Sequence, residues 1–429
     1  MQWIQALLYL YLLSSPAVLG APAQRSQLKK RTFKVDRIRR ADYVPNGLSA
    51  VKKAHAKFGI IPSDVNFGSL DFNHFTTAAD RQALNKTDEP DENGAVANVP
   101  AHNDVLYLAP VTIGGQEFVM NFDTGSSDTW VYNTKLDSSV SAGHSVFDPA
   151  KSSTFQLLEG STFNITYGDR SFARGGVGAD TIDIGGATVE NQAFGLPSEI
   201  SESFRSEEAS DGMIGLAFST INTMKPQRRA TFLENLAPDL EEPVFTAQLK
   251  AQAPGSYEFG TVDQAKFSGD MVDIAVDKSR GFWEVKSSMF MIGDGDDEDV
   301  RTISRGVTTA IADTGTTLML VNQEIVEAYY AKVEGSQMSV NAGGYIYPCS
   351  STLPDLWVSV GDTHLARVPG SLINFATVGT DTSTSKELCF GGVQSNQGSD
   401  LQIWGDTFFK ALFVAFDMRG PKLRMAAHS

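Results

Sequence analysis

Two copies of the tripeptide Asp-Thr-Gly are the residues in this chain best suited to chemistry. The first lies in NFDTGSSDTW and holds the carboxylate of Asp123, and the second lies in TAIADTGTTLMLV and holds the carboxylate of Asp313. An aspartate before a glycine is usually a turn residue, because its short side chain bonds to nearby backbone groups. A single copy would favour that plain interpretation.

A second repeated element argues against chance. MIGLAF follows the first copy and IWGDTFF follows the second. Gly215 lies 92 residues after Asp123, and Gly405 lies 92 residues after Asp313. Two linked elements that recur at one spacing indicate two lobes of similar topology, related by a pseudo-two-fold axis.

Such an axis would bring the two loops together and place Asp123 and Asp313 face to face. Two carboxylates in contact do not both ionise easily, so they share a proton. One then acts as a base and the other as an acid, which is what hydrolysis of an amide bond by activated water requires. The glycines allow the backbones to approach closely, and the neighbouring hydroxyls can hold the carboxylates by hydrogen bonds.

The segments that must position these loops are predicted to be mostly β-strands. VLYLAPVTIGGQEFVMNF predicts two strands joined at Gly114-Gly115, and STFNITYGDRSFARGGVGADTIDIGG predicts a further hairpin and one more strand. NQEIVEAYYAKV is the clearest helical pattern. The 429 residues, 41% hydrophobic and 20% charged, fit a globular protein of two to three domains.

Charge divides the chain into a basic arm and an acidic body. Residues 21–62 hold 11 basic and 2 acidic side chains, a net charge of +9, and the rest of the chain carries −25. This asymmetry favours an arm that binds its own body over one that binds nucleic acid. Within the arm, SAVKKAHAKFGI places Ala50, Val51, Ala54 and Phe58 at helical spacing.

The N-terminus and the cysteines predict an exported protein. The first 24 residues carry no charge, and LLYLYLL followed by small residues is typical of a secretory signal, although its start lacks Lys or Arg. No run is long enough to span a membrane, so no membrane anchor is expected. A monomer is also expected. Cys349 and Cys389, the only cysteines, are expected to form a disulfide that contributes about 3–4 kcal/mol. No metal-ligand spacing is present, so no metal or cofactor is expected.

With their companions, the two Asp-Thr-Gly loops resemble the pepsin family of aspartic proteases, and most closely its secreted fungal members such as penicillopepsin and aspergillopepsin. PVTIGG, FDPAKSSTF, YGD, DGMIGLAF, IADTGTTL and IWGD follow the family's order from about Asn98 to the C-terminus. The resemblance implies an all-β, bilobal acid protease fold with a cleft between the lobes and a β-hairpin flap. The expected parts are a signal peptide (residues 1–20), a basic propeptide (21–92), an N-terminal β lobe (93–275) and a C-terminal β lobe (276–429).

The resemblance also implies a role for each matched residue. Asp123 and Asp313 would hold the attacking water. The threonines after them would bond across to the opposite loop, and the next hydroxyls would bond to the outer carboxylate oxygens. The residues expected to support the two loops are Thr124, Gly125, Ser126, Thr314, Gly315 and Thr316. Taken alone, each hydroxyl is also compatible with an ordinary turn.

A second group is expected on the flap and in contact with substrate: Tyr167, Gly168, Asp169, Ser171, Trp130, Phe204 and Met213. Tyr167 would bond to Trp130, and the less favoured alternative is that both are ordinary strand aromatics. Phe204 and Met213 can equally be core residues. Asp169 implies acceptance of a Lys before the cut, as in fungal relatives with Asp at this position. Arg170 beside it departs from that pattern and would oppose the effect, and a plain hairpin-tip role is the alternative.

The basic arm resembles the propeptide of zymogens in this family. Lys57 and Phe58 match its Lys–aromatic pair, so Lys57 is expected to pair with the catalytic carboxylates as an intramolecular inhibitor. Acid would protonate the body and release the arm, which predicts self-activation, an acid optimum and a mature chain that starts near Asp91–Gly94. The alternative is a separate convertase, for which Lys30-Arg31 and Arg39-Arg40 offer dibasic sites, although simple surface contacts are the favoured role of these pairs. Secretion is expected, with a vacuole as the alternative destination.

Two further expectations complete the prediction. Asn85 and Asn164 fit the N-glycosylation pattern, and the second lies beside the flap tyrosine.

The competing functions are a catalytically weak pepsin-like binding protein and a glycoside hydrolase, which also uses paired carboxylates. The unbroken Asp, Gly and Tyr positions disfavour the first, and the duplicated loop and propeptide disfavour the second. Protein and peptide substrates with hydrophobic residues around the cut are expected.

Overall fold

The computed structural model describes residues 33–36, 46–60, 97–101, 106–167, 171–205, 209–251, 253–294, 300–381 and 384–429. The chain divides into two compact units, Met1–Lys30 and Arg31–Ser429, and every described residue belongs to the second. The predicted signal peptide, the dibasic pairs, Asn85 and the predicted start of the mature chain lie outside the described residues.

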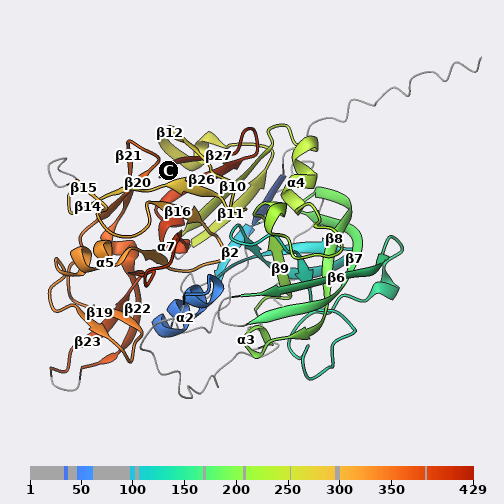
Figure 1. The fold of residues 1–429 in the computed structure, drawn as a ribbon, viewed down its shortest axis with the longest axis horizontal. Coiled ribbons are helices and arrows are strands. Elements are labelled where there is room, and N and C mark those ends of the chain that lie inside the picture. Colours follow the sequence, from blue (N-terminus) through green and yellow to red (C-terminus); the bar gives the residue numbers. More distant parts are fainter. Residues whose placement is uncertain are drawn as a thin grey trace, which may run out of the picture. The chain divides into compact units, whose positions relative to one another are not determined.

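Strands dominate the described residues, as the alternating pattern predicts (Figure 1). The largest sheet has 14 strands in the order β12-β27-β26-β10-β11-β1-β2-β3-β4-β9-β5-β8-β7-β6. In chain order these strands are β1 Phe33–Asp36, β2 Ala97–Ala101, β3 Leu106–Ile113, β4 Gln116–Asp123, β5 Trp130–Val131, β6 Gln156–Thr166, β7 Phe172–Ile184, β8 Ala187–Ile200, β9 Gly212–Gly215, β10 Val244–Lys250, β11 Ala253–Phe259, β12 Phe267–Ala275, β26 Leu412–Asp417 and β27 Lys422–His428.

Three smaller sheets use only strands from the C-terminal part of the chain. Their orders are β13-β16-β25-β17-β24, β15-β14-β20-β21 and β18-β19-β23-β22. Their strands are β13 Glu284–Lys286, β14 Met289–Ile292, β15 Arg301–Thr302, β16 Thr309–Ala312, β17 Met319–Val321, β18 Gln337–Ser339, β19 Gly344–Pro348, β20 Leu356–Val360, β21 His364–Val368, β22 Asn374–Thr380, β23 Glu387–Gly391, β24 Val393–Ser395 and β25 Gln402–Trp404. The predicted boundary between lobes at residues 275 and 276 falls at the end of β12 and remains a prediction.

The helices are short and lie between strands. They are α2 Gly47–Lys57, α3 Glu202–Arg205, α4 Phe232–Leu236, α5 Gln323–Tyr330, α6 Gly370–Ile373 and α7 Asp406–Phe409, with 3-10 turns η2 Pro149–Lys151, η3 Ser219–Ile221, η4 Ala237–Asp239 and η5 Gln264–Lys266. Helix α5 is the one that the sequence predicts most clearly. It buries Ile325, Val326, Tyr329 and Tyr330, which lie on one face because positions one turn apart in a helix share a side.

The predicted hairpins form, with one difference. Strands β3 and β4 join at Gly114 and Gly115, whose φ angles of 54° and 75° favour glycine. In the next hairpin, β6 pairs with β7. The sequence predicted that this second strand would end and that a separate strand would follow it, but β7 continues without a break for 13 residues. Its glycines do not end the strand. They leave room for close neighbours, since a Cβ on Gly175 would lie 2.3 Å from the carbonyl oxygen of Leu196.

The two Asp-Thr-Gly loops sit in matching strand arrangements. Strand β4 pairs in parallel with β9, Asn121 opposite Met213, and β16 pairs in parallel with β25, Ala310 opposite Gln402. Partners lie 92 positions apart in both pairs, so the spacing found in the sequence is the register of these strands. The strand that leaves each loop, β5 or β17, then pairs antiparallel with β9 or β25.

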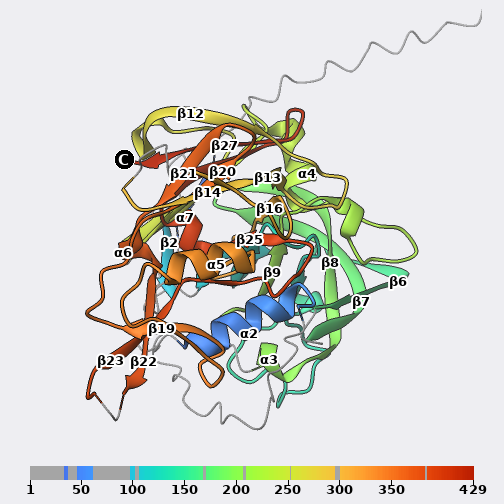
Figure 2. The same cartoon turned by 60° about the vertical axis from the view of Figure 1, so that its left-hand side comes forward.

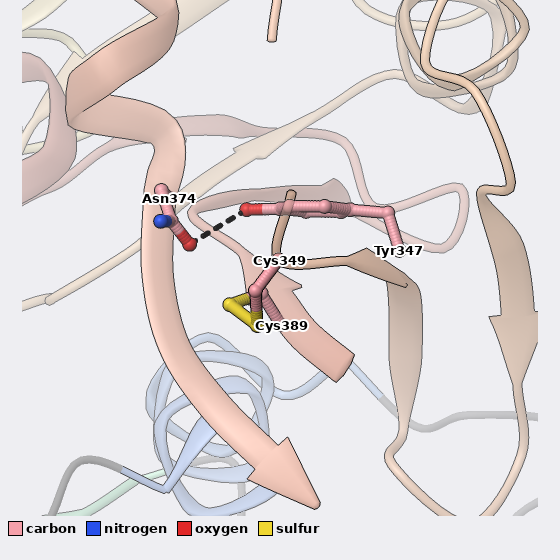
Figure 3. Close-up of a disulfide and its surroundings, with 4 residues drawn as sticks. All are labelled: Tyr347, Cys349, Asn374 and Cys389. Atoms are coloured by element: carbon pink, nitrogen blue, oxygen red, sulfur yellow. Dashed lines mark hydrogen bonds between the residues drawn. A yellow bond between two sulfur atoms is a disulfide. The ribbon is translucent and has the colours of Figure 1, made fainter. Parts of the chain in front are cut away.

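The disulfide fastens two strands of a C-terminal sheet. Cys349 lies directly after β19, and Cys389 lies within β23 (Figure 3). Tyr347 lies opposite Cys389 in this pairing, and its hydroxyl donates to Oδ1 of Asn374 at 3.0 Å. The predicted pairing of the two cysteines is therefore confirmed.

Candidate active site

The two aspartates are fully buried at the ends of equivalent strands. Asp123 ends β4, and Asp313 directly follows β16; both side chains are 0% exposed. The backbone fixes each one, because the carbonyl of Asp123 accepts from Leu216 N at 2.8 Å and Asp313 N donates to Trp404 O at 3.0 Å. Backbone bonds to the ends of the neighbouring strands β9 and β25 therefore help to hold the two aspartates.

Two threonine hydroxyls lock the loops to each other. Thr124 Oγ1 donates to Ala312 O at 2.8 Å and accepts from Thr314 N at 3.0 Å. In the reciprocal arrangement, Thr314 Oγ1 donates to Phe122 O at 2.7 Å and accepts from Thr124 N at 3.2 Å. These four buried hydrogen bonds obey the pseudo-two-fold relation and bring the loops into contact.

Each carboxylate receives matching donors from its own loop. Gly125 N and Gly315 N donate to Oδ1 of Asp123 and Asp313 at 2.8 and 2.9 Å. On the outer oxygens, Ser126 Oγ donates to Asp123 Oδ2 at 2.6 Å, and Thr316 Oγ1 donates to Asp313 Oδ2. The structure therefore brings together all eight residues that the sequence places in the two loops.

The glycines are required by the close approach of the loops. A Cβ on Gly125 would lie 2.5 Å from Oδ1 of Asp313, and a Cβ on Gly315 would lie 2.5 Å from Oδ1 of Asp123. Both distances are too short for non-bonded atoms. Each carboxylate thus packs against the opposite glycine, and the two acids form one site.

Lys57 occupies the space in front of both carboxylates. Its Nζ lies 2.6 Å from Asp123 Oδ1, 2.7 Å from Asp313 Oδ1 and 2.8 Å from Asp313 Oδ2, and its side chain is 9% exposed. Burial opposes the charge of the ammonium, but the two carboxylates outweigh it and raise the pKa of Lys57. The ammonium therefore stays protonated inside the site.

The two aspartates differ in how they respond to this site. Burial favours the neutral form of Asp123, but the charge of Lys57 and hydrogen bonds from Lys57 and Ser126 outweigh it and lower the pKa. For Asp313, burial and the charge of Asp123 prevail over Lys57 and raise the pKa to about 6. The pair therefore holds one proton in weak acid, in the manner of coupled carboxylates.

Helix α2 carries Lys57 into the site. In Figures 1 and 2 it lies between green strands of the N-terminal part and orange strands of the C-terminal part. Asn46 caps its start by accepting from Ser49 N at 3.1 Å. Ala50, Val51 and Ala54 are buried in a cluster with side chains of the C-terminal part, among them Ile311 and Phe390. The predicted apolar face of the arm is therefore buried against the body.

Two further residues of the arm contact the body beside Lys57. The ring of Phe58 meets the ring of Phe282 edge-on, with centroids 6.3 Å apart. His55 is buried, and its Nε2 lies 2.7 Å from the carbonyl oxygen of Ser395. Burial lowers the pKa of His55, although this bond partly opposes the shift. His55 was not predicted as a contact residue, although its position one turn after Val51 places it on the same buried face of the helix.

The hairpin of β6 and β7 carries Tyr167 over the first loop. Tyr167 N donates to Ser171 O at 2.8 Å, and both residues are buried. Gly168, Asp169 and Arg170 lie outside the described residues. Phe204 packs edge-on against Trp130 and Tyr167, with ring centroids 5.2 and 5.3 Å apart.

The hydroxyl of Tyr167 interacts with a sulfur as well as with the Trp130 side chain that the resemblance implies. It donates to Sδ of Met213 at 3.2 Å. Ser126 Oγ, whose hydrogen is donated to Asp123, lies 3.4 Å from the same sulfur. Burial and the charge of Asp123 raise the pKa of Tyr167 well above its usual value, so the hydroxyl stays neutral. A hydrogen bond with the Trp130 side chain lowers the pKa of Tyr167 but does not prevail.

Comparison with known proteins agrees with this geometry. The model of the eukaryotic aspartyl protease family matches residues 106–428, and the chain belongs to this family. Its fold is the bilobal, all-β pepsin-like fold, and its enzyme class is that of the aspartic endopeptidases, which act on peptides. The resemblance found in the sequence is confirmed.

The similar proteins are fungal. The chain is 59% identical over 405 residues to "Aspartic protease PEP3" of Coccidioides posadasii, covering 94% of this chain and 91% of the relative. It is 49% identical over 431 residues to a putative aspergillopepsin A-like aspartic endopeptidase of Aspergillus fumigatus, covering 100% of both. Penicillopepsin-2 of Penicillium janthinellum is 44% identical over 335 residues, covering 78% and 81%. Among the helices that the structure describes, none is long and apolar enough to cross a membrane.

Proposed function

We propose that this chain is the zymogen of a secreted, acid-active endopeptidase whose own arm blocks the catalytic carboxylates. The observation that carries the proposal is the position of Lys57 Nζ, 2.6 Å from Asp123 and 2.7 Å from Asp313. An ammonium at this point fills the place that an attacking water needs. Substrate cannot react until helix α2 leaves.

The proposed reaction uses the shared proton of the dyad. Once Lys57 has left, a water held between the two carboxylates gives a proton to the ionised aspartate as it attacks the peptide carbonyl carbon. The protonated aspartate gives its proton to the carbonyl oxygen, which forms a neutral tetrahedral diol. Proton transfer to the amide nitrogen then breaks the C–N bond. No covalent enzyme intermediate is required.

The buried network serves this mechanism by fixing the two acids. The glycine N–H groups and the Ser126 and Thr316 hydroxyls favour ionisation, whereas burial opposes it. The crossed threonine bonds prevent the loops from moving apart when Lys57 departs. A dyad held in this way is ready to bind water without reorganisation.

The proposed substrate is an extended peptide with hydrophobic side chains around the cut. Support comes from the apolar cluster of Trp130, Tyr167, Phe204 and Met213 beside Asp123. Acceptance of Lys through Asp169 stays a prediction, as does occupancy of Asn164, which is exposed on β6. Secretion, the monomeric state and the cleavage site near residues 91–94 also stay predictions.

The test is acidification of the purified full-length zymogen. We expect loss of the arm, release of peptides from an acid-denatured protein, and inhibition by a pepstatin-type compound. Asp123→Asn should abolish hydrolysis, whereas the exposed change Asp137→Asn should not. Activity that appears only near neutral pH would contradict the proposal. A catalytically weak binding protein would show no hydrolysis in wild type either.

A peptide library digested at several acid pH values tests the specificity. Cleavage after Lys, lost in Asp169→Ser, would support the role of Asp169. If cleavage after Lys is absent in wild type, Arg170 offsets that carboxylate or Asp169 is a plain hairpin-tip residue. Mass measurement before and after deglycosylation reports the occupancy of Asn164.

A further inference from the structure

A short segment joins the first catalytic loop to the flap strand. Residues 222–225, which we call the strap, lie between the loop after Asp123 and strand β6. On the loop side, Asn222 Nδ2 donates to Ser127 O at 3.1 Å. On the flap side, Lys225 N donates to Thr162 O at 2.8 Å, and Thr162 N donates to Lys225 O at 3.0 Å.

The centre of the strap carries a chain of hydrogen bonds between the two sides. The backbone N of Asn164, three residues before the flap tyrosine, donates to Thr223 Oγ1 at 3.2 Å. Thr223 Oγ1 donates in turn to Asp128 Oδ1 at 2.9 Å. Thr223 N also donates to Asp128, at 3.0 Å to Oδ2 and 3.2 Å to Oδ1. The carboxyl of Asp128 thus binds the strap, and the strap hydroxyl binds the flap strand.

The carboxyl of Asp128 is buried, and no cation among the described residues contacts it. It is 1% exposed, and in this part of the chain its hydrogen bonds all come from Thr223. Burial raises the pKa of Asp128 to about 6, although the bonds from Thr223 oppose the shift. A Cβ on Gly215 of β9 would lie 2.6 Å from Asp128 N, so the loop also packs tightly against that strand.

The charged groups around Asp128 do not neutralise it. On the strap side Lys225 is exposed and Arg229 is half-buried; neither is among the groups that shift the pKa of Asp128. On the loop that carries Asp128, the neighbouring ionisable residue is Asp123. On the flap hairpin, the ionisable residue nearby is Tyr167, whose pKa is raised in part by the charge of Asp128. Asp169 and Arg170 lie outside the described residues.

We propose that Asp128 and Thr223 are positioning residues that tie the loop of Asp123 to the flap strand. The inference rests on the proposed roles of Asp123 and of the flap. Thr223 supplies the mechanical link through its hydroxyl, and Asp128 supplies its anchor in the loop. The link holds the base of the flap at a fixed distance from the dyad.

The link works best when Asp128 is neutral. A buried carboxylate without a cation is costly, so ionisation draws the side chain towards water and loosens its hold on Thr223. In acid the carboxyl carries its proton and stays in place. As the pH rises through the raised pKa of Asp128, the flap strand loses its anchor, and substrate binding weakens with it.

The test compares acid-activated variants at about pH 4 and about pH 6.5. Thr223→Val keeps the shape of the side chain and removes the hydroxyl. We expect this variant to lower kcat/KM about fivefold, which is the effect of one lost hydrogen bond, mostly through a higher KM. Thr223→Ser should restore kcat/KM.

The side chain of Asp128→Asn cannot ionise. The ratio of its kcat/KM to that of wild type should therefore be at least threefold higher at about pH 6.5 than at about pH 4. The matched controls are Thr134→Val and Asp137→Asn, both exposed in the same part of the chain.

Hydrogen exchange over residues 156–167 gives a measure that does not depend on activity. We expect faster exchange in Thr223→Val than in Thr134→Val. Equal exchange in the two variants overturns the link, as does an Asp128→Asn ratio that is the same at both pH values. If Thr223→Val speeds exchange but wild type hydrolyses nothing, the proposed function fails while the link stands.

Discussion

At the scale of single residues, the glycines of the two loops decide whether a dyad can form. Gly125 packs against Asp313, and Gly315 packs against Asp123. A Cβ on either glycine would lie 2.5 Å from a carboxylate oxygen of the opposite aspartate. Any side chain there must push the opposite carboxylate away. The glycine in Asp-Thr-Gly is therefore needed for the contact between the two loops, in addition to the turn conformation that glycine commonly adopts.

Gly125→Ala should separate the two acids. We expect kcat/KM to fall about 100-fold, because small displacements of catalytic groups have effects of that size, and stability to fall by about 1–3 kcal/mol from overpacking. Kinetics and denaturant unfolding measure the two effects. The control is Gly176→Ala on β7, where a Cβ meets nothing within 4 Å. Equal activity in both variants would show that the loops tolerate a side chain.

Among the described residues, Lys57 is the cation in contact with both buried carboxylates. Lys57→Met keeps most of the side-chain length and removes the charge, which leaves the buried carboxylates without a cation at a cost of about 3–5 kcal/mol. We expect the full-length variant to bind a pepstatin-type inhibitor at a pH where wild type does not. It should also lose its arm at a higher pH.

The comparison for this variant is Lys53→Met, which changes a lysine of the same helix and leaves the contact with the dyad in place. Inhibitor binding is followed by fluorescence, and loss of the arm by gel mobility. If Lys57→Met stays as closed to the inhibitor as Lys53→Met, the arm is held by the apolar face of α2 alone.

At the scale of elements, helix α2 combines an apolar face with a histidine that responds to pH. Burial lowers the pKa of His55 in the docked arm, so the docked state binds fewer protons than the released state. Docking is therefore favoured above the usual pKa of histidine, near 6.5, and weakens as the pH falls below it. We therefore expect acid to act on the helix as well as on the carboxylates.

His55→Gln should delay activation. Glutamine can still donate to Ser395 O, but it takes up no proton, so its docking does not weaken through this route. We expect the pH at which half of the zymogen has lost its arm to fall by several tenths of a unit, measured over a series of buffers. His364→Gln, a change at an exposed histidine, should leave the midpoint where it is. An unchanged midpoint in His55→Gln would mean that the carboxylates alone set the pH of release.

The sequence predicts the elements that carry a repeated or alternating pattern. The 92-residue spacing gives the register of β4 with β9 and of β16 with β25, and the helical spacing of the arm gives the buried face of α2. Glycines misled the prediction within β7, because they serve close packing there as well as turns.

The link through Thr223 and Asp128 leaves no pattern in the sequence. The two residues lie 95 positions apart, and their hydrogen bonds depend on how the strap crosses the loop. The same holds for the sulfur of Met213, which accepts a hydrogen bond from the Tyr167 hydroxyl. Sequence reasoning finds residues that recur, whereas these contacts arise once, from tertiary packing.

At the scale of the whole molecule, the opposite charges of the arm and the rest of the chain link stability to pH and salt. The arm carries +9 and the remainder −25, so losing the arm raises the self-repulsion of the body near neutral pH. We expect the Tm of the mature enzyme to fall as the pH rises from about 4 to about 7, and more steeply than that of a zymogen inactivated by Asp123→Asn. Thermal unfolding at low salt measures both.

Salt then separates two causes of this fall. Repulsion among exposed carboxylates is screened at about 1 M salt, where the Debye length is roughly 3 Å, whereas a buried group is screened much less. The folded state holds a proton on Asp128 up to about pH 6 that an unfolded aspartate releases near 3.9, so stability from this group is lost as the pH rises through that window, by up to about 3 kcal/mol. The decrease in Tm with pH that remains at high salt should be smaller in Asp128→Asn than in wild type. In Asp137→Asn it should be the same as in wild type. A fall that salt removes completely would assign the neutral-pH instability to surface charge alone.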